Sequence, residues 1–242
     1  MFVAIAYNTA ICATSPDGIN WTQRTMPGGS RGWWGVGFGN GLFVAVVAAD
    51  GTSFCTTSPD GITWTDRTMP KGEWYSVTFG NGLFVAVTFS GAICATSPDG
   101  ITWTSRVMPS INWVSVTYGN GLFVAVSQAN TKTGIAISPD GITWAQQQTA
   151  NAMTWGAVAY GNGVFVAVGY NASICATSPD GILWTNQDMP TSGWRGIAFA
   201  NGVFVAVAAT YAVTIQTVYS PTRFGLPRIP TGYPLTTYMK VK

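Results

Sequence analysis

The chain has 242 residues, within the range of one large all-β domain, and only 8% of them are charged, against about 25% in an average domain. The formal net charge of +2 gives no reason to expect nucleic acid or an acidic membrane surface as a partner. The longest apolar run, Leu42 to Ala49, is too short to span a bilayer. Met1 leads directly into a strand-like segment at Phe2, so we expect neither a signal peptide nor membrane insertion.

The four cysteines occupy one equivalent position, three residues before the Ser of a repeated Ser-Pro-Asp-Gly motif: Cys12, Cys55, Cys94 and Cys175. Equivalent points of separate structural units should lie farther apart than the roughly 7 Å limit for a disulfide. The corresponding residue in the remaining repeat is Ile135, which indicates a buried apolar site. We therefore expect free, buried thiols in a chain made in a reducing cytosol. The chain has no His, and we expect no metal and no cofactor.

Three motifs recur in step along the chain. The Ser-Pro-Asp-Gly copies begin 43, 39, 41 and 40 residues apart, at Ser15, Ser58, Ser97, Ser138 and Ser178. An Asn-Gly-Leu/Val-Phe-Val-Ala-Val motif begins at Asn40, Asn81, Asn120, Asn162 and Asn201. A Trp stands seven residues before each of these, at Trp33, Trp74, Trp113, Trp155 and Trp194. A period near 40 residues is typical of propeller blades or helical arrays, and the Gly-rich, β-branched and aromatic content favours strands.

One unit resolves into four short strands. The first runs from Trp113 to Tyr118, and an Asn-Gly hairpin leads to the second, from Phe123 to Val126. The third and fourth correspond to residues 93–96 and 101–104 of another copy. Four antiparallel strands per repeat, arranged radially, make a β-propeller. Small residues fit an innermost strand, where blades crowd the axis. Four Met-Pro pairs are interpreted as loop anchors that end the fourth strand: Met26-Pro27, Met69-Pro70, Met108-Pro109 and Met189-Pro190.

The sequence predicts an all-β propeller of four-stranded blades over residues 1–219, with an extended arm at 220–242. The simplest closure joins the strand at Trp194 to the strands at Phe2, Ile11 and Ile19, which gives five blades. The strand pair at 203–219 is then left over, and it packs beneath the disc or replaces the N-terminal strand. A six-bladed ring with incomplete terminal blades stays open as the alternative.

The Ser-Pro-Asp-Gly copies are predicted to be type I turns with a bulge at Gly, which join the third strand to the fourth. The Ser and Asp side chains can bond nearby backbone N–H groups. These residues resemble the Asp-box of sialidase-like propellers, S-x-D-x-G-x-x-W, although Asp and Gly are adjacent here. The resemblance implies a structural role for the five turn aspartates: Asp17, Asp60, Asp99, Asp140 and Asp180.

The remaining residues do not supply an obvious catalytic set. Outside the turns, the acids are the scattered Asp50, Asp66, Asp188 and Glu73, so paired carboxylates for glycoside hydrolysis are not apparent. A Ser-His-Asp arrangement is impossible without His. Arg195 is the one arginine expected near an innermost strand, whereas sialidases need an arginine cluster. We therefore expect no enzyme activity.

Glycan binding is the more plausible function. Each unit offers a Trp ring and, after the fourth strand, a polar residue. The repeat resembles five-bladed lectins of the tachylectin type, which use repeated sites between blades. The candidate binding residues are Trp21, Trp64, Trp103, Trp144, Trp184, Arg24, Arg67 and Arg106. The alternative is that these Trp side chains form the core between blades.

The arm at 220–242 is apolar and contains four prolines, so it cannot build its own core. It resembles the ends of bacteriophage tail-fibre and collar proteins, which often finish in an F-x-L-P…Y-[IM]-K-x pattern. The resemblance implies a virion protein whose arm contacts other virion proteins or copies of itself through Phe224, Leu226, Tyr233 and Tyr238. An arm that covers its own propeller is the alternative. The expected function is thus host-surface glycan binding by a non-enzymatic virion component, and a free lectin-like module is the second candidate.

Overall fold

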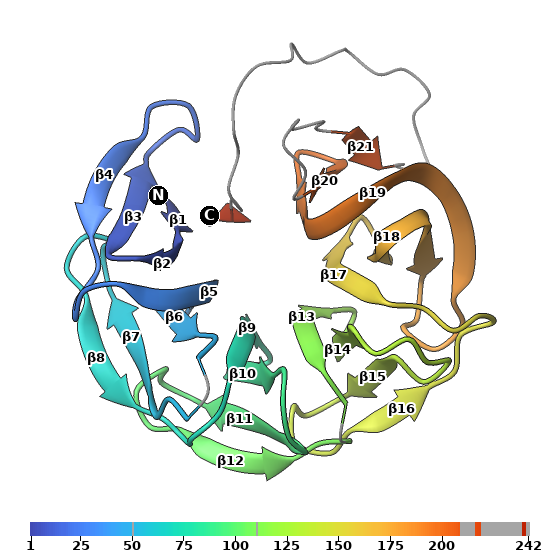
Figure 1. Ribbon diagram of the computed structural model, residues 1–242, viewed down its shortest axis with the longest axis horizontal. Coiled ribbons are helices and arrows are strands. Elements are labelled where there is room, and N and C mark those ends of the chain that lie inside the picture. The colour runs from blue at the N-terminus through green and yellow to red at the C-terminus, as the bar shows by residue number, and fades with distance from the viewer. Residues whose placement is uncertain (50, 110, 209–215, 219–238, 241–242) are drawn as a thin grey trace.

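The computed structural model describes residues 1–49, 51–109, 111–208, 216–218 and 239–240. Their strands form five small antiparallel sheets around a common centre, which is a five-bladed β-propeller (Figure 1). The predicted fold class is therefore confirmed. The predicted arm residues Phe224, Leu226, Tyr233 and Tyr238 lie outside the described residues.

The sheets follow the chain in order. The N-terminal sheet contains β1 (Phe2–Ile5), β3 (Ile11–Ser15) and β4 (Thr22–Thr25), with β22 (Met239–Lys240) beside β1. The next contains β2 (Tyr7–Thr9), β5 (Arg31–Gly39), β6 (Leu42–Val47), β7 (Phe54–Ser58) and β8 (Thr65–Thr68). Two regular blades follow: β9 (Trp74–Gly80), β10 (Leu83–Thr88), β11 (Ile93–Ser97) and β12 (Thr104–Val107), then β13 (Trp113–Gly119), β14 (Leu122–Ser127), β15 (Ile135–Ser138) and β16 (Ala145–Gln147). The last contains β17 (Trp155–Gly161), β18 (Val164–Ser178), β19 (Thr185–Ala200), β20 (Val203–Ala208) and β21 (Gln216–Val218).

The last sheet spans two consecutive repeats because β19 continues from one into the next. Its first half pairs with β18, and its second half, from Trp194, pairs with β20. The predicted closure of the Trp194 strand onto the N-terminal strands is therefore wrong, and residues 203–208 are not a leftover strand. The physical reason is local: Asn201 and Gly202 both have positive φ, 52° and 80°, and form a two-residue hairpin that makes β20 the nearest partner.

The fourth strand of each blade begins later than predicted. The sequence places it at residues 101–104 in the first regular blade, whereas β12 runs from Thr104 to Val107. The backbone N–H groups of Ile101 and Thr102 both donate to Oδ1 of Asp99, at 2.8 Å. These groups cannot also donate to a neighbouring strand, so the ladder starts only after the following Trp.

Small residues on the innermost strands are confirmed as a packing requirement. A Cβ added to Gly35 would come within 2.7 Å of the carbonyl oxygen of Tyr75, and one added to Gly37 within 2.8 Å of that of Val77. Neighbouring inner strands approach so closely that larger side chains would force their backbones apart.

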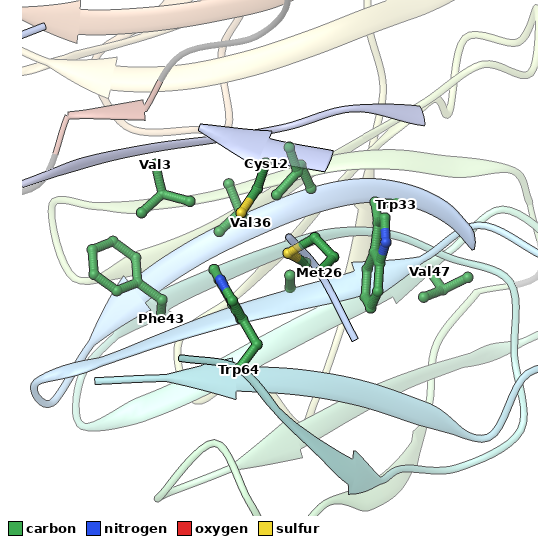
Figure 2. Packing of buried hydrophobic residues seen from close by; sticks show 10 residues of the cluster. Val3, Cys12, Met26, Trp33, Val36, Phe43, Val47 and Trp64 are labelled. Atoms are coloured by element: carbon green, nitrogen blue, oxygen red, sulfur yellow. The ribbon is translucent and has the colours of Figure 1, made fainter. Parts of the chain in front are cut away.

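The hydrophobic core is divided among clusters that lie between consecutive repeats. In the first, Val3 and Cys12 from the N-terminal sheet pack against Trp33, Phe43 and Trp64 from the next (Figure 2). The five Trp residues of the inner strands are each at most 1% exposed and are the largest buried side chains. Each blade between the two terminal sheets thus contributes one face to each of two clusters, and each repeat is stabilised mainly by packing against its neighbours.

Candidate functional site

The Ser-Pro-Asp-Gly turns use their own side chains to hold their backbone. Ser58 Oγ donates to Asp60 Oδ1 at 2.9 Å and accepts from the N–H of Gly61 at 2.8 Å. The same Asp60 oxygen accepts from the N–H groups of Ile62 and Thr63, at 2.8 Å each. These backbone hydrogen bonds lower the pKa of Asp60. The other four turns repeat the Asp contacts, and the pKa of each carboxyl is lowered for the same main reason: Asp17, Asp99, Asp140 and Asp180.

The candidate Trp residues of the outer blade edge pack between repeats. The indole Nε1 of Trp103 donates to the carbonyl of Gly100 at 3.1 Å, and its ring lies near Phe84 and against the thiol of Cys55 in the preceding repeat. Trp64 makes the equivalent contact with Cys12 and is 9% exposed. The other four candidates, which are partly buried, are Trp21, Trp103, Trp144 and Trp184. They keep part of their surface available to a ligand.

All four thiols are free and buried, as the repeat alignment predicts. Burial raises the pKa of Cys55 to about 12, and the pKa values of Cys94 and Cys175 to about 11. Such thiols are almost entirely protonated at neutral pH and behave as small apolar side chains.

The candidate arginines lie across the outer strands. Arg67 Nε donates to Thr57 Oγ1 at 3.1 Å, and Arg24 and Arg106 make the same contact with Thr14 and Thr96. Because only Nε is used among the residues that the structure describes, the terminal nitrogens of each guanidinium stay available to a ligand. The structure thus places each Arg on the same blade edge as the Trp three residues before it in the sequence.

Strand alternation gives the propeller two distinct faces. The upper face is the one at which the inner strands begin. The lower face is the opposite one, which carries the Asn-Gly hairpins and the Ser-Pro-Asp-Gly turns. Trp103 and Asp99 precede β12 and so lie toward the lower face, whereas Tyr75 and Arg195 lie near the start of inner-strand segments, toward the upper face.

A cavity of about 360 Å³ occupies the centre of the propeller, between the inner strands. Its walls include Ser76, Thr78, Ser115 and Thr117, and the side chain of Gln128. At the upper end, Trp34, Tyr75 and Arg195 also line it. Central hollows of this size fall within the range of small-ligand sites.

Aromatic rings form a continuous row along part of the upper rim. Trp34 contacts Tyr7 edge-on at a centroid distance of 5.3 Å and Tyr75 at 4.6 Å. Tyr75 in turn stacks on Phe89 at 4.7 Å. Burial raises the pKa of the Tyr75 hydroxyl, and the negative charge of Glu73 adds to this increase. The positive charge of Arg195 lowers the same pKa.

Arg195 stands on the rim three repeats after Tyr75. Its guanidinium lies 4.4 Å from the ring centroid of Tyr170, and Nη2 donates to the Tyr170 hydroxyl at 2.9 Å. Within the described part of the chain, the single ion pair joins Arg31 and Asp66. Arg195 therefore has no carboxylate partner there.

Sequence reasoning singled out Arg195 but missed Trp34, Tyr75, Phe89 and Tyr170. A signal was present in the repeat alignment. The residue after the inner-strand Trp is different in every copy, namely Trp34, Tyr75, Val114, Gly156 and Arg195. The positions that follow along the strand are nearly uniform, so this variation marks the rim.

The described residues contain no group of three or more His, Cys, Asp or Glu side chains that could hold a metal ion. They also contain no helix that is long and apolar enough to cross a membrane.

No protein-family model matches this sequence, and no curated protein matches it. Solved structures are similar in fold. Virginiamycin B lyase from Staphylococcus aureus is 14% identical, with a TM-score of 0.72 over 86% of this chain and 73% of that one. YCF48 bound to D1 peptide is 14% identical, with a TM-score of 0.63 over 92% and 82%. A chain of a nidogen–laminin complex is 8% identical, with a TM-score of 0.70 over 90% and 89%. At these identities the likeness establishes the β-propeller fold and nothing finer.

Proposed function

We propose that the chain is a non-enzymatic adhesion protein of a phage-like particle and that it binds glycans on the host surface. The observation that carries the binding role is the repeated blade edge. Three blades carry an indole ring and a guanidinium on the same outer edge, as in Trp103 and Arg106, and among the described residues that guanidinium uses only its Nε. Flat apolar faces and directional donors on one edge suit sugar rings.

The turn carboxylates support a role without catalysis. Each accepts backbone N–H groups within its own turn, as Asp60 does, and its lowered pKa makes it a poor general acid at neutral pH. A carboxylate already committed to holding a turn is also badly placed to act as a nucleophile.

The particle is proposed from the resemblance of the C-terminal arm to phage fibre ends, and those residues lie outside the described part. A lectin-like module outside any particle is the second candidate, because the repeated blade edge supports binding equally in both settings. Mass spectrometry of purified particles from the source of this chain separates the two. The virion proposal expects the chain at a fixed ratio to the other particle proteins.

An array of neutral and acidic glycans, probed with the full-length chain, tests the binding role. We expect retention on a subset of glycans, and a weaker signal for Arg106→Ala, since that change removes one of several similar sites. Lys132→Ala, which removes an exposed cation away from these edges, serves as the control. Absence of retention on every glycan, with a folded chain, would contradict the proposal.

A further inference from the structure

Two positions of the repeat vary while their surroundings stay nearly constant, and both reach the upper rim. The first is the residue after the inner-strand Trp, described above. The second lies five residues after the Phe of the second strand and is occupied by Tyr7, Ala48, Phe89, Gln128 and Tyr170. Uniform positions in the repeat build the same blade each time. Positions that vary among the copies make the rim asymmetric, so that it presents one site rather than several equal ones.

The variable residues are sorted by chemistry around the rim. The earlier repeats supply the aromatic row of Tyr7, Trp34, Tyr75 and Phe89. The later ones supply Arg195, which stacks on Tyr170. The opening therefore has flat apolar faces on one side and a cation on the other.

The guanidinium of Arg195 is available and oriented to bind an anion. Arg195 is exposed, has no carboxylate partner among the described residues, and is oriented by its stacking and hydrogen bond to Tyr170. A guanidinium fixed in this way loses less conformational freedom when it forms a forked pair with a carboxylate. The negative charge of Glu73 is felt at Tyr75, on the aromatic side of the opening. Because like charges repel, a ligand anion is expected to orient toward Arg195.

The cavity wall below the rim is polar and firmly built. Ser76 Oγ accepts from the N–H of Val116 in the next blade, and Ser115 Oγ accepts from that of Val158, at 3.2 Å each. Each hydroxyl retains its own hydrogen for donation. Hydroxyl-rich walls under aromatic faces suit a polyhydroxylated ring better than a purely apolar ligand.

We propose that the upper rim of the central cavity binds a saccharide that carries a carboxylate, with Arg195 holding the carboxylate and Trp34 and Tyr75 covering the sugar ring. This inference rests on the proposed glycan-binding function and adds a single central site, distinct from the repeated sites near the lower face. The volume of about 360 Å³ is at the lower end of the usual range for ligand pockets, which fits one or two sugar units at the end of a glycan.

Calorimetric titration of the full-length chain with methyl glucuronide, and with the methyl ester of the same sugar, tests the site. We expect saturable binding of the acid at one molecule per chain, and at least tenfold weaker binding of the uncharged ester. Arg195→Gln should weaken acid binding at least tenfold, and Arg195→Lys should restore part of it. Lys132→Gln, which removes another exposed cation, should change it less than twofold. Circular dichroism confirms that each variant is folded.

The other outcomes separate this site from the general proposal. If the acid binds but its affinity falls in Arg106→Gln and not in Arg195→Gln, glycan binding stands and the central site is wrong. If acid and ester bind equally, the role of Arg195 is wrong. If neither sugar binds while the array retains other glycans, the central site is wrong and the glycan-binding function stands. If the array also retains no glycan, both the central site and the glycan-binding function are wrong. Binding of a peptide with a free C-terminus in place of the sugar would overturn the ligand class.

Discussion

The indole Nε1 of Trp113 donates to the carbonyl oxygen of Pro109 at 2.8 Å. Trp74 and Trp194 make the same bond to Pro70 and Pro190. The equivalent nitrogens of Trp33 and Trp155 are buried and have no partner in the described part of the chain. Spacing explains the difference, because the bond forms where Pro precedes Trp by four residues. Pro27 precedes Trp33 by six, and the fourth repeat has no Pro at this position.

Replacing these tryptophans by Phe should therefore have unequal costs. Trp113→Phe and Trp155→Phe remove a similar ring area, but the first also removes a hydrogen bond to the Pro109 carbonyl, which keeps only the N–H of Ile111, whereas the second removes an unsatisfied N–H. We expect Trp113→Phe to lower the free energy of unfolding by about 1–2 kcal/mol more than Trp155→Phe. Urea denaturation of both variants measures the difference, and equal or reversed costs would contradict this account of the inner tryptophans.

Acid should destabilise the propeller through its turns. The pKa of each turn Asp is lowered in the folded state from the ordinary 3.8, so the carboxylates stabilise the fold above that value. This contribution is lost as the pH falls through the lowered folded-state pKa values. We expect stability to change little from pH 7 to pH 5, and to fall steadily below about pH 4.

Asp60→Ala provides the matched comparison for the acid effect. At pH 7 it should lower stability by about 1 kcal/mol or more, because the N–H groups of Ile62 and Thr63 lose their acceptor. Between pH 5 and pH 2.5 it should lose less stability than the parent chain, since one titrating group is gone. Denaturation at several pH values decides the matter, and identical pH slopes for both proteins would show that the turn carboxylate does not contribute.

The thiols should be unreactive until the fold opens. Because burial raises the pKa of Cys55 to about 12 and covers the sulfur, iodoacetamide at pH 8 should modify the native chain slowly. In denaturant without reductant, the intact mass should show alkylation of all four cysteines that the structure leaves free. Two or fewer modified residues would mean that a disulfide had formed. That result would contradict the repeat, which places the four cysteines in separate blades.

The blade could be predicted from the sequence because its determinants are local. Asn120 and Gly121 both adopt positive φ, 48° and 77°, as an Asn-Gly hairpin requires, and the Ser-Pro-Asp-Gly turns follow directly from their residues. The pattern puts the start of the fourth strand too early, because it does not show that Asp99 withdraws two N–H groups from the ladder.

Closure and the central site were harder to predict, because they depend on how distant repeats meet. The strand at Trp194 could pair with either of two similar strands, and only its own hairpin at Asn201 decides between them. Tyr75 and Arg195 are separated by 120 positions in the sequence, so nothing local shows that they line one cavity. Comparing the repeats position by position would have found them.

Truncation after Tyr219 tests the role proposed for the arm. If the arm joins this chain to other particle proteins or to copies of itself, the truncated chain should keep its melting temperature and lose association, as measured by light scattering. Met239 and Lys240 pair with Val3 and Phe2 of the same chain, which makes the contrary result informative. A lowered melting temperature, with a monomeric full-length chain, would assign the arm to its own propeller and remove the main support for a virion role.

The central claim is that this propeller binds a glycan without changing it. The most direct measurement titrates the full-length chain with the free glycan that the array retains best, and then determines the mass of the glycan recovered from the complex. The account predicts saturable binding and a recovered glycan of unchanged mass. Failure to saturate, or a glycan that returns shortened, would contradict it.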